Sequence, residues 1–344
     1  GIPTLEDKVL QRAVVMLLEP IYEQDFLDCS YGFRPGRSAH QALESFRDQL
    51  MNCRGGWVLE VDIRKFFDNL DHGHLREFLR LRVCDGVLLR LIDKWLSAGV
   101  MEDGSVSYPD AGTPQGGVVS PLLSNVFLHY VLDQWFAQDV KPRMRNRAFL
   151  IRYADDFVIG FRDKRDAQRV MDVVPKRFGR FGLTVHPTKT KLVPFRRPSS
   201  QTQDRSGDRD DRPGTFNLLG FTHYWARSQR GYWIVKLKTA SDRFSRAVRS
   251  IDSWCRDRRH WSLKKQQQKL NEKLRGHYAY YGVTGNSGAL SRFKWEVEHR
   301  WRKWLDRRNR EHSLTWQVFR RLLQRFPLAP VRTSRSIYVR AANP

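Results

Sequence analysis

Two adjacent aspartates, Asp155 and Asp156, interrupt an apolar run, residues 149–161, that otherwise has the pattern of a β-hairpin. Neighbouring carboxylates raise each other's pKa, so a hairpin tip holds two of them at low cost only where divalent cations neutralise their charge. A third acid, Asp62, ends the strand-like run of residues 57–62. Brought beside the pair in space, Asp62 would complete an all-oxygen site of the kind that Mg²⁺ prefers.

Three such carboxylates predict a two-metal centre for phosphodiester synthesis. One cation sharpens a 3′-hydroxyl nucleophile, and the other, about 3.5 to 4 Å away, holds a triphosphate and its departing pyrophosphate. The alternative is a chance pair of surface acids. Apolar strand residues on both sides of Asp155 and Asp156 favour the metal site, because acids at a buried strand tip need a compensating partner.

The hydrophobic pattern predicts the elements that must position these acids. Before the first strand, a helix capped by Thr4 ends at Pro20, and a basic loop over residues 30–38, able to hold phosphate groups, opens a second helix. After the first strand, the pattern predicts helices within 73–97 and an apolar helix after the loop 112–120, followed by the hairpin that contains the two acids. A helix over 164–181, a loop and strand over 182–193, and a hairpin of 216–222 with 232–237 come next.

The chain is strongly basic, and the excess is uneven. It has 61 Lys and Arg against 37 Asp and Glu, a net charge of +24, which is typical of a protein that binds nucleic acid. Residues 241–344 hold 25 of the basic and 8 of the acidic side chains in a helical pattern, so we expect this part to grip the nucleic acid. The segment 196–214 has almost no apolar residues, which predicts a flexible insertion.

Composition also excludes several classes of protein. The four cysteines are scattered without a C-x-x-C pair, so neither a zinc site nor a disulfide framework is indicated. No apolar run approaches the roughly 20 residues of a membrane span, and the amino terminus has no signal-like stretch. We therefore expect no membrane partner and a cytoplasmic location of the bacterial type, with association with the nucleoid as a further option.

Eight sequence blocks occur in one order along the chain. In one-letter code they are GIPTLEDKVLQRA (1–13), SYGFRPGRS (30–38), VDIRKFFDNLDH (61–72), GTPQGGVVSPLLSN (112–125), YADD (153–156), GLTVHPTKT (182–190), FNLLGF (216–221) and KLRGHYAYYG (273–282). With these blocks the chain resembles a reverse transcriptase of the group II intron maturase kind. The resemblance extends over nearly the whole chain, and it implies that fingers segments precede residue 1.

The resemblance implies a role for each matched position. Asp62, Asp155 and Asp156 would be the catalytic ligands of two Mg²⁺ ions, helped by the Ile63 carbonyl. Phe67 would be a bulky gate beneath the sugar, whose ring collides with a ribose 2′-OH so that dNTPs are preferred. Arg34 and Arg37 would contact the template or RNA. The nucleotide would be bound by Ile63, Arg64, Lys65, Phe66, Phe67, Gln115, Gly116 and Lys189, and Lys189 would also assist the departure of pyrophosphate. Leu219, Gly220 and Phe221 would form the primer grip.

Some of these residues have an ordinary structural alternative. Phe66 is at least as well explained as a core aromatic, and Lys189 as one of many solvated cations. Gln115 could do no more than satisfy loop amides. Three tryptophans near helical spacing, Trp295, Trp301 and Trp304, fit the core of the carboxyl-terminal helices better than a base-stacking platform.

Together these observations predict an α/β (α+β) right-hand polymerase fold. Residues 1–237 would form fingers and palm with an antiparallel sheet, and residues 238–344 an all-α thumb or maturase region. The protein would copy an RNA template into DNA from a DNA or RNA primer, using dNTPs, and would also bind group II intron RNA. Two alternatives are an RNA-binding splicing maturase with little polymerase role, and a domesticated relative used in phage defence or DNA repair.

Overall fold

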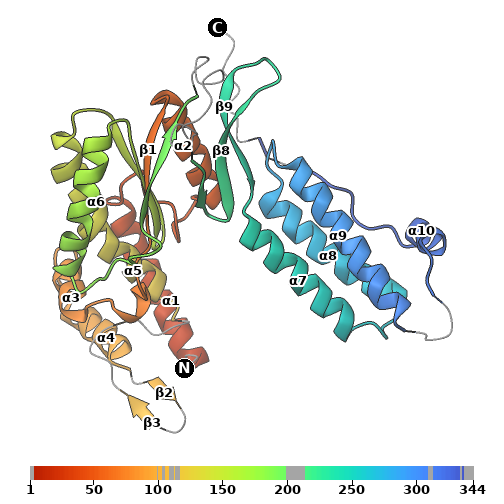
Figure 1. Cartoon of the computed structure of the whole chain (residues 1–344). Helices are drawn as coiled ribbons and strands as arrows, with labels where there is room; N and C mark the ends of the chain where they lie inside the picture. Colours follow the sequence, from red (N-terminus) through yellow and green to blue (C-terminus); the bar gives the residue numbers. More distant parts are fainter. Residues whose placement is uncertain are drawn as a thin grey trace. The chain divides into compact units, whose positions relative to one another are not determined.

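The structure, a computed structural model, describes residues 4–98, 100–102, 105–107, 112, 117–198, 214–308, 313–333 and 335–336. The chain forms two compact units, Gly1–Leu219 and Gly220–Pro344, whose ribbons are shown in Figure 1. The division at residue 219 places the strand pair 221–239 with the carboxyl-terminal helices. The assignment of residues 1–237 to fingers and palm and of the rest to a thumb stays a prediction, and most of the predicted insertion 196–214 lies outside the described residues.

The first unit is built around a four-stranded antiparallel sheet in the order β4-β5-β1-β6. Its strands are β1 (Gly55–Val61), β4 (Ala148–Tyr153), β5 (Asp156–Phe161) and β6 (Lys191–Arg196). Because β1 and the β4–β5 hairpin are buried on both faces, they are almost continuously apolar. The acids Asp62, Asp155 and Asp156 therefore occur where this apolar character stops, at one end of the central strands.

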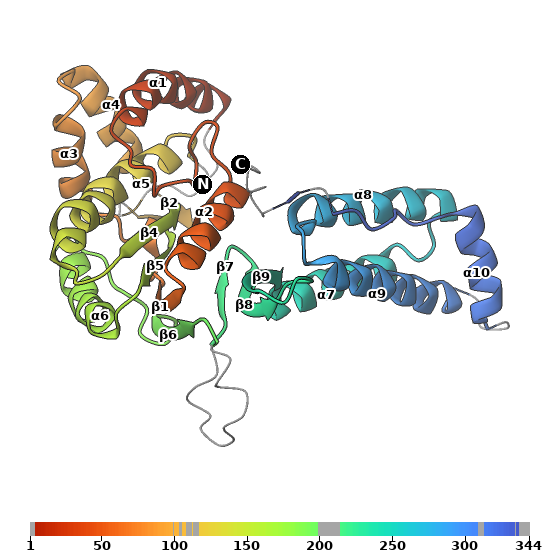
Figure 2. The ribbon, with the colours of Figure 1, turned by 90° about the horizontal axis from the view of Figure 1, so that it is seen from above.

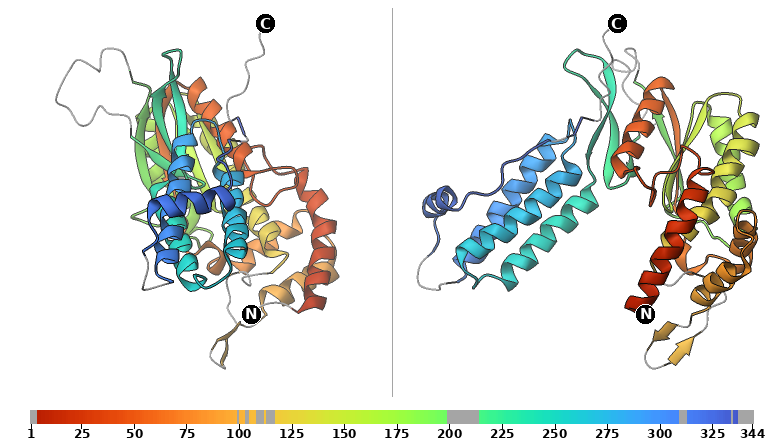
Figure 3. Two further views of the ribbon diagram at one scale, coloured as in Figure 1. Left: turned by 90° about the vertical axis from the view of Figure 1, so that its right-hand side faces the viewer. Right: turned by 180° about the vertical axis from the view of Figure 1, so that it is seen from behind.

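Helices cover both faces of the sheet (Figures 2 and 3). Helix α2 (Ala39–Asn52) packs on one face, where the Phe46 ring lies 5.6 Å from the ring of Phe149 on β4. Helix α6 (Lys164–Gly179) packs on the other face, with Phe178 5.8 Å from Phe157 on β5. Burial of such aromatic rings is the main favourable term that holds the strands, and hence the acids at their ends, in place.

The first unit contains further helices, short strands and turns. They are α1 (Leu5–Glu23), the 3₁₀ turn η1 (Phe66–Asp68), α3 (His72–Arg80), α4 (Gly86–Leu96), β2 (Val100–Glu102), β3 (Ser105–Ser107), α5 (Ser120–Leu128), the π-helical turns η2 (His129–Asp133) and η3 (Phe136–Val140), the 3₁₀ turn η4 (Lys141–Arg143) and β7 (Phe216–Leu218). Thr4 caps α1 as predicted, but the predicted end at Pro20 is wrong. Only the last turn follows Pro20, so the ring removes a single backbone bond near a frayed end.

The second unit begins with a hairpin of β8 (Phe221–Arg227) and β9 (Trp233–Thr239). The hairpin predicted from residues 216–222 and 232–237 is thus wrong in its first strand, because Leu219 and Gly220 both adopt positive φ and break the extended run. The described residues after β9 form the helices α7 (Ser241–Asp257), α8 (Leu263–Tyr281), α9 (Ser287–Asp306) and α10 (Trp316–Arg325). No helix in the described part of the chain is both long and apolar enough to span a bilayer.

The core of this unit is apolar and aromatic, and the half-buried ring of His277 packs against it. Trp301 is fully buried and donates through Nε1 to Oε1 of Gln266 on α8, at 2.9 Å. The His277 ring stacks on Phe293 with 3.9 Å between centroids, and its Nε2 has no hydrogen-bond partner within the described residues. Burial lowers the pKa of His277 to about 4, because the imidazolium would lose its water.

We expect this histidine to make the protein less stable in mild acid. Since the unfolded chain binds the proton at the ordinary pKa of 6.5 and the folded chain only near 4, the free energy of unfolding is full above pH 6.5 and falls towards pH 4. Between these two pKa values, His277 lowers the free energy of unfolding by at most about 1.4 kcal/mol for each pH unit of acidification. Urea unfolding of the wild type and of His277→Phe at several pH values measures the difference; identical pH dependence in both proteins would refute this assignment.

Candidate active site

The register of the sheet places Asp62 next to the acid pair. Val61, the last residue of β1, is paired with Phe157 of β5, and Asp62 and Asp156 are the next residues beyond this last pair of the ladder. The two acids thus come from segments 94 residues apart in sequence, and the backbone alone brings them together.

Asp155 lies in the tight turn that joins β4 to β5. Tyr153 pairs with Asp156, so Ala154 and Asp155 form a two-residue turn, and Ala154 takes the positive φ, 57°, that such turns require. The pKa of Asp155 is raised, first by burial and then by the charge of Asp62, while Arg152 opposes the shift. A bound cation would relieve the two effects that raise this pKa.

A lysine already neutralises one of the three acids. Nζ of Lys189 lies 3.1 Å from Oδ2 of Asp62, and the lysine side chain is 61% exposed. The backbone of Asp62 is held by the same turn, since its carbonyl accepts from the His186 amide at 2.7 Å. Within the described residues no three His, Cys, Asp or Glu side chains are gathered closely enough to hold a metal ion. The three acids share a strand end without forming a preformed cage.

Behind the turn lies a buried charge network that the sequence did not reveal. The Arg152 guanidinium is fully buried and donates to both carboxylate oxygens of Asp133, at 2.8 and 2.6 Å. Its Nη1 also donates to Oδ1 of Asn125, at 2.9 Å, and to the carbonyl of Ala154, at 3.1 Å. Arg152 therefore fixes the backbone of the residue that immediately precedes Asp155.

The loop of residues 30–38 supports the same turn. Gly32 packs so closely that a Cβ on it would lie 2.2 Å from the amide nitrogen of Ala154, and its carbonyl accepts from Nδ2 of Asn125 at 2.7 Å. Only glycine fits this close approach of two backbones. Asn125 thus joins the glycine loop to Arg152, so the SYGFRPGRS and SPLLSN blocks meet behind the acids.

The two phenylalanines after Asp62 have different surroundings. Phe66 is buried in the core, in edge contact with Phe127 at 6.4 Å between centroids, so we do not retain it as a nucleotide contact. Phe67 is half-buried and packs at the edge of that core, where its ring is accessible. Ile63 is buried and bridges Val185, whereas Arg64 and Lys65 are exposed, Lys65 with φ of 47°.

The predicted nucleotide residues Gln115 and Gly116 lie outside the described residues, but their flanks are anchored. Gly112 donates from its amide to the Leu70 carbonyl at 2.7 Å and comes so close to the Phe67–Asp68 backbone that a Cβ would lie 2.9 Å from the Asp68 carbonyl oxygen. On the other side, the amide of Val118 donates to Oε1 of Gln11 at 2.7 Å. The loop therefore starts beside the predicted gate residue.

The predicted primer-grip residues lie where one unit ends and the next begins. Leu219 and Gly220 have φ of 49° and 78°, and a Cβ on Gly220 would lie 2.9 Å from the Tyr281 hydroxyl. Phe221 is fully buried against Tyr280 and Tyr281. Phe221 therefore anchors the turn, whereas Leu219 and Gly220 are partly exposed and remain the predicted contacts with a primer.

The two loop arginines also differ. Arg34 is buried, and each of its three nitrogens is engaged, because it donates to both carboxylate oxygens of Glu23 and to the carbonyls of Leu27 and Ser30. We therefore withdraw the RNA contact predicted for it. Arg37 pairs with the exposed Asp28, at 2.6 Å, and keeps part of its side chain in solvent.

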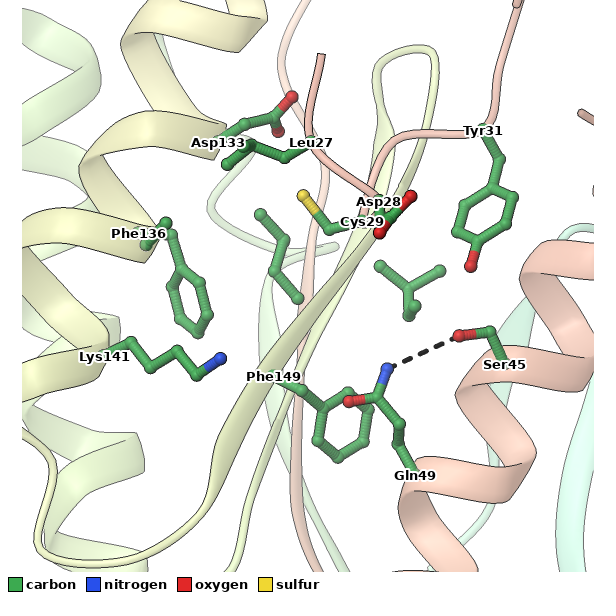
Figure 4. Close-up of a pocket in the computed structure, with 13 residues that line it drawn as sticks. Leu27, Asp28, Cys29, Tyr31, Ser45, Gln49, Asp133, Phe136, Lys141 and Phe149 are labelled. Atoms are coloured by element: carbon green, nitrogen blue, oxygen red, sulfur yellow. Dashed lines mark hydrogen bonds between the residues drawn. The ribbon is translucent and has the colours of Figure 1, made fainter. Parts of the chain in front are cut away.

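A pocket of about 300 Å³ lies on the α2 side of β4 (Figure 4). Polar residues from several elements line it, among them Asp133, Gln49 and Lys141, and Gln49 donates to Ser45 at 3.5 Å. None of the three predicted catalytic acids lines this pocket. Asp133, the partner of Arg152, contributes to its wall, and the pocket is not the site where the three acids meet a substrate.

Comparison with known families decides the identity of this arrangement. Residues 1–223, which contain the sheet and all three acids, match the family described as reverse transcriptase (RNA-dependent DNA polymerase). The chain belongs to the reverse transcriptase family. Residues 243–323 of this reverse transcriptase match a second family, the group II intron maturase-specific domain. The predicted resemblance and the predicted fold class, antiparallel sheets with a helical carboxyl-terminal region, are confirmed.

Individual relatives resemble parts of this reverse transcriptase. Protein YkfC of Escherichia coli is 38% identical over 46% of this chain and 49% of its own length, and the group II intron-encoded protein LtrA of Lactococcus lactis is 45% identical over 40% of this chain and 22% of its own. The alignments thus span about half or less of these relatives. The solved telomerase of Candida albicans covers 92% of this chain and 54% of its own at 12% identity, with a TM-score of 0.46.

Proposed function

We propose that this reverse transcriptase is an RNA-directed DNA polymerase that extends a DNA or RNA primer with dNTPs on an RNA template. The observation that carries the proposal is the pairing of Val61 with Phe157, which sets Asp62 beside Asp155 and Asp156 within the matched family region. Three carboxylates at one strand end are the donor set that hard divalent cations require. A raised pKa at Asp155 supports the same reading.

Two Mg²⁺ ions bound by Asp62, Asp155 and Asp156, with help from the Ile63 carbonyl, would supply activation of the primer hydroxyl and charge neutralisation on the triphosphate. The chain's own residues prepare this site. Arg152 holds the Ala154 carbonyl and so fixes the turn that presents Asp155. Lys189 neutralises the charge of Asp62 in the absence of metal. Once cations replace the lysine at Asp62, its exposed ammonium group would be free to assist the departing pyrophosphate.

Primer extension tests the proposal directly. The protein is given a primed RNA template and dNTPs with Mg²⁺ or with a chelator in excess. We expect templated extension that requires Mg²⁺, with no product in the chelated sample. Product that forms equally well in the chelator, or no extension of any primed RNA by a folded protein with Mg²⁺, would refute it.

Phe67 is proposed as the residue that selects the sugar. In Phe67→Ala we expect the ratio of kcat/KM for dNTP over rNTP to fall by roughly 10- to 100-fold, because the ring that obstructs a 2′-OH is gone. Phe66→Ala is the matched control, since it removes a core ring one position away and should cost about 3 to 5 kcal/mol of stability without relaxing sugar choice. A Phe67→Ala protein as selective as the wild type would contradict the assignment.

The maturase match supports a second function, binding of group II intron RNA by the carboxyl-terminal unit. Its evidence is the family match at residues 243–323 together with the basic excess of residues 241–344. Phosphate contacts of this kind weaken steeply as salt rises. Splicing of a group II intron RNA in the presence of Asp155→Asn protein separates the functions. If the Asp155→Asn protein still promotes splicing, the RNA-binding function is independent of polymerisation. If the wild type does not promote splicing, the proposed intron-RNA function is refuted.

A further inference from the structure

A row of aromatic rings lies on the outside of the carboxyl-terminal unit. The Trp295 ring is 3.6 Å from the His299 ring, and His299 is 4.5 Å from the ring of Trp316 on α10, centroid to centroid. Trp295 is 52% exposed and Trp316 37% exposed, whereas Trp301, on the same helix as Trp295, is fully buried. Trp295, His299 and Trp316, here called the Trp295 stack, are therefore a surface feature and not part of the core.

Positive charge surrounds the Trp295 stack. The Arg302 guanidinium lies 4.5 Å from the centre of the Trp316 ring, held there by a bond from its Nε to the Leu314 carbonyl at 3.0 Å. Helix α10 contains no acidic residue and exposes three arginines, Arg320, Arg321 and Arg325. The nearby carboxylates of α9 are neutralised, because Glu296 pairs with Arg300 and Glu298 with Lys294.

Indole faces beside guanidinium groups suit one chemical class of partner. Unpaired bases stack on aromatic rings, and their phosphates are attracted to the neighbouring arginines. A fully paired helix offers its phosphates but hides its base faces, so it has no use for the rings. The residues around the stack, such as Arg292, Gln317 and Arg320, are exposed and polar, whereas the centre of a protein-binding patch is depleted of charge.

We propose that the Trp295 stack binds unpaired bases of a single-stranded RNA segment. RNA is favoured because the stack lies within residues 243–323, which match the maturase-specific domain. The inference thus deepens the proposed binding of intron RNA and names its ligand class. It is separate from polymerisation, which requires the acids of the other unit.

The test compares three probes of one sequence: an unstructured RNA of about 20 nucleotides, the corresponding RNA duplex, and single-stranded DNA. For Trp295→Ala we expect about tenfold or more weaker binding of the unstructured RNA, with duplex affinity, salt dependence and primer extension unchanged. Trp295→Phe, which keeps a ring, should restore most of the affinity. Tyr232→Ala is the matched control, because it removes a 66% exposed aromatic of the same unit, on the segment between β8 and β9.

A second measurement uses the unaltered protein and so does not depend on a variant that folds. Ultraviolet cross-linking of RNA that contains 4-thiouridine should map to peptides with Trp295 or Trp316. Equal loss of duplex and single-strand binding in Trp295→Ala, or weaker binding of the DNA but not of the RNA, would overturn the inference. Unchanged binding of the unstructured RNA by this variant would also overturn it, as would the absence of cross-links at these peptides. If the wild type binds none of the RNA probes, the proposed intron-RNA function fails as well, whereas normal binding by Trp295→Ala removes only the role of the stack.

Discussion

Replacement of Asp155 by Asn is expected to abolish primer extension on RNA while leaving RNA binding largely intact. The amide is neutral and a poor ligand for a hard cation, so the site loses both a metal ligand and the charge that opposes the cations. We expect the rate of nucleotide addition to fall by roughly 10³-fold or more, the scale seen when a main electrostatic stabiliser of a transition state is removed. Single-turnover extension with saturating dNTP measures this rate.

Glu60→Gln provides the matched control for this experiment. Glu60 lies on β1, two residues before Asp62, and is partly buried like Asp155, but it pairs with Lys191 at 3.1 Å. The control should retain most of the activity. Loss of a negative charge near the template leaves RNA affinity equal or slightly higher in Asp155→Asn, so a large parallel loss of RNA binding would contradict the metal assignment.

The second large effect is expected at the buried pair behind the turn. Asp133→Ala leaves the Arg152 guanidinium, which is fully buried, without its counter-ion. Breaking such a pair costs about 3 to 5 kcal/mol, because an uncompensated charge remains in the interior. We expect urea unfolding to report a loss of this size. A loss below about 1 kcal/mol, the range of exposed ion pairs, would show that the pair is not buried in solution.

A double variant separates the structural role of this pair from its role in positioning. In Asp133→Leu combined with Arg152→Met, apolar groups fill the space of both partners, which restores most of the stability lost by the single variant. The bonds from Arg152 to the Ala154 carbonyl and to Asn125 are absent, however, so the turn is no longer fixed. We expect kcat for nucleotide addition to stay low while KM for dNTP changes little. Full recovery of kcat would show that the pair serves folding alone.

The sequence revealed the acids and their chemistry because their signal is local. Asp155 and Asp156 interrupt a strand pattern, and the position of Asp62 at the end of another strand is readable from alternation alone. Their proximity in space follows from strand pairing, which no local pattern specifies. The pairing of Val61 with Phe157 therefore had to come from the structure.

The residues that support the acids could not be predicted for the same physical reason. Arg152 has the sequence appearance of a solvated cation, and Asp133 that of an ordinary acid on a helix. Only their mutual burial makes them partners. Conversely, Arg34 seemed available to RNA, but its donors are consumed by Glu23 and two carbonyls. Trp295 was expected in the core and is exposed, because helical spacing alone does not show which face of α9 packs inward.

The central claim is that Asp62, Asp155 and Asp156 hold divalent cations together, and affinity cleavage tests it most directly. Fe²⁺ that replaces Mg²⁺ reduces added hydrogen peroxide to hydroxide and a short-lived hydroxyl radical, and ascorbate returns the iron to Fe²⁺. The radicals cut the backbone close to the bound metal. We expect cuts at two places distant in sequence, near Asp62 and near Asp155, in the presence of primed template and dNTP, and the loss of both in Asp155→Asn. Cuts near only one of these positions, or cuts that persist in the variant, would contradict the account.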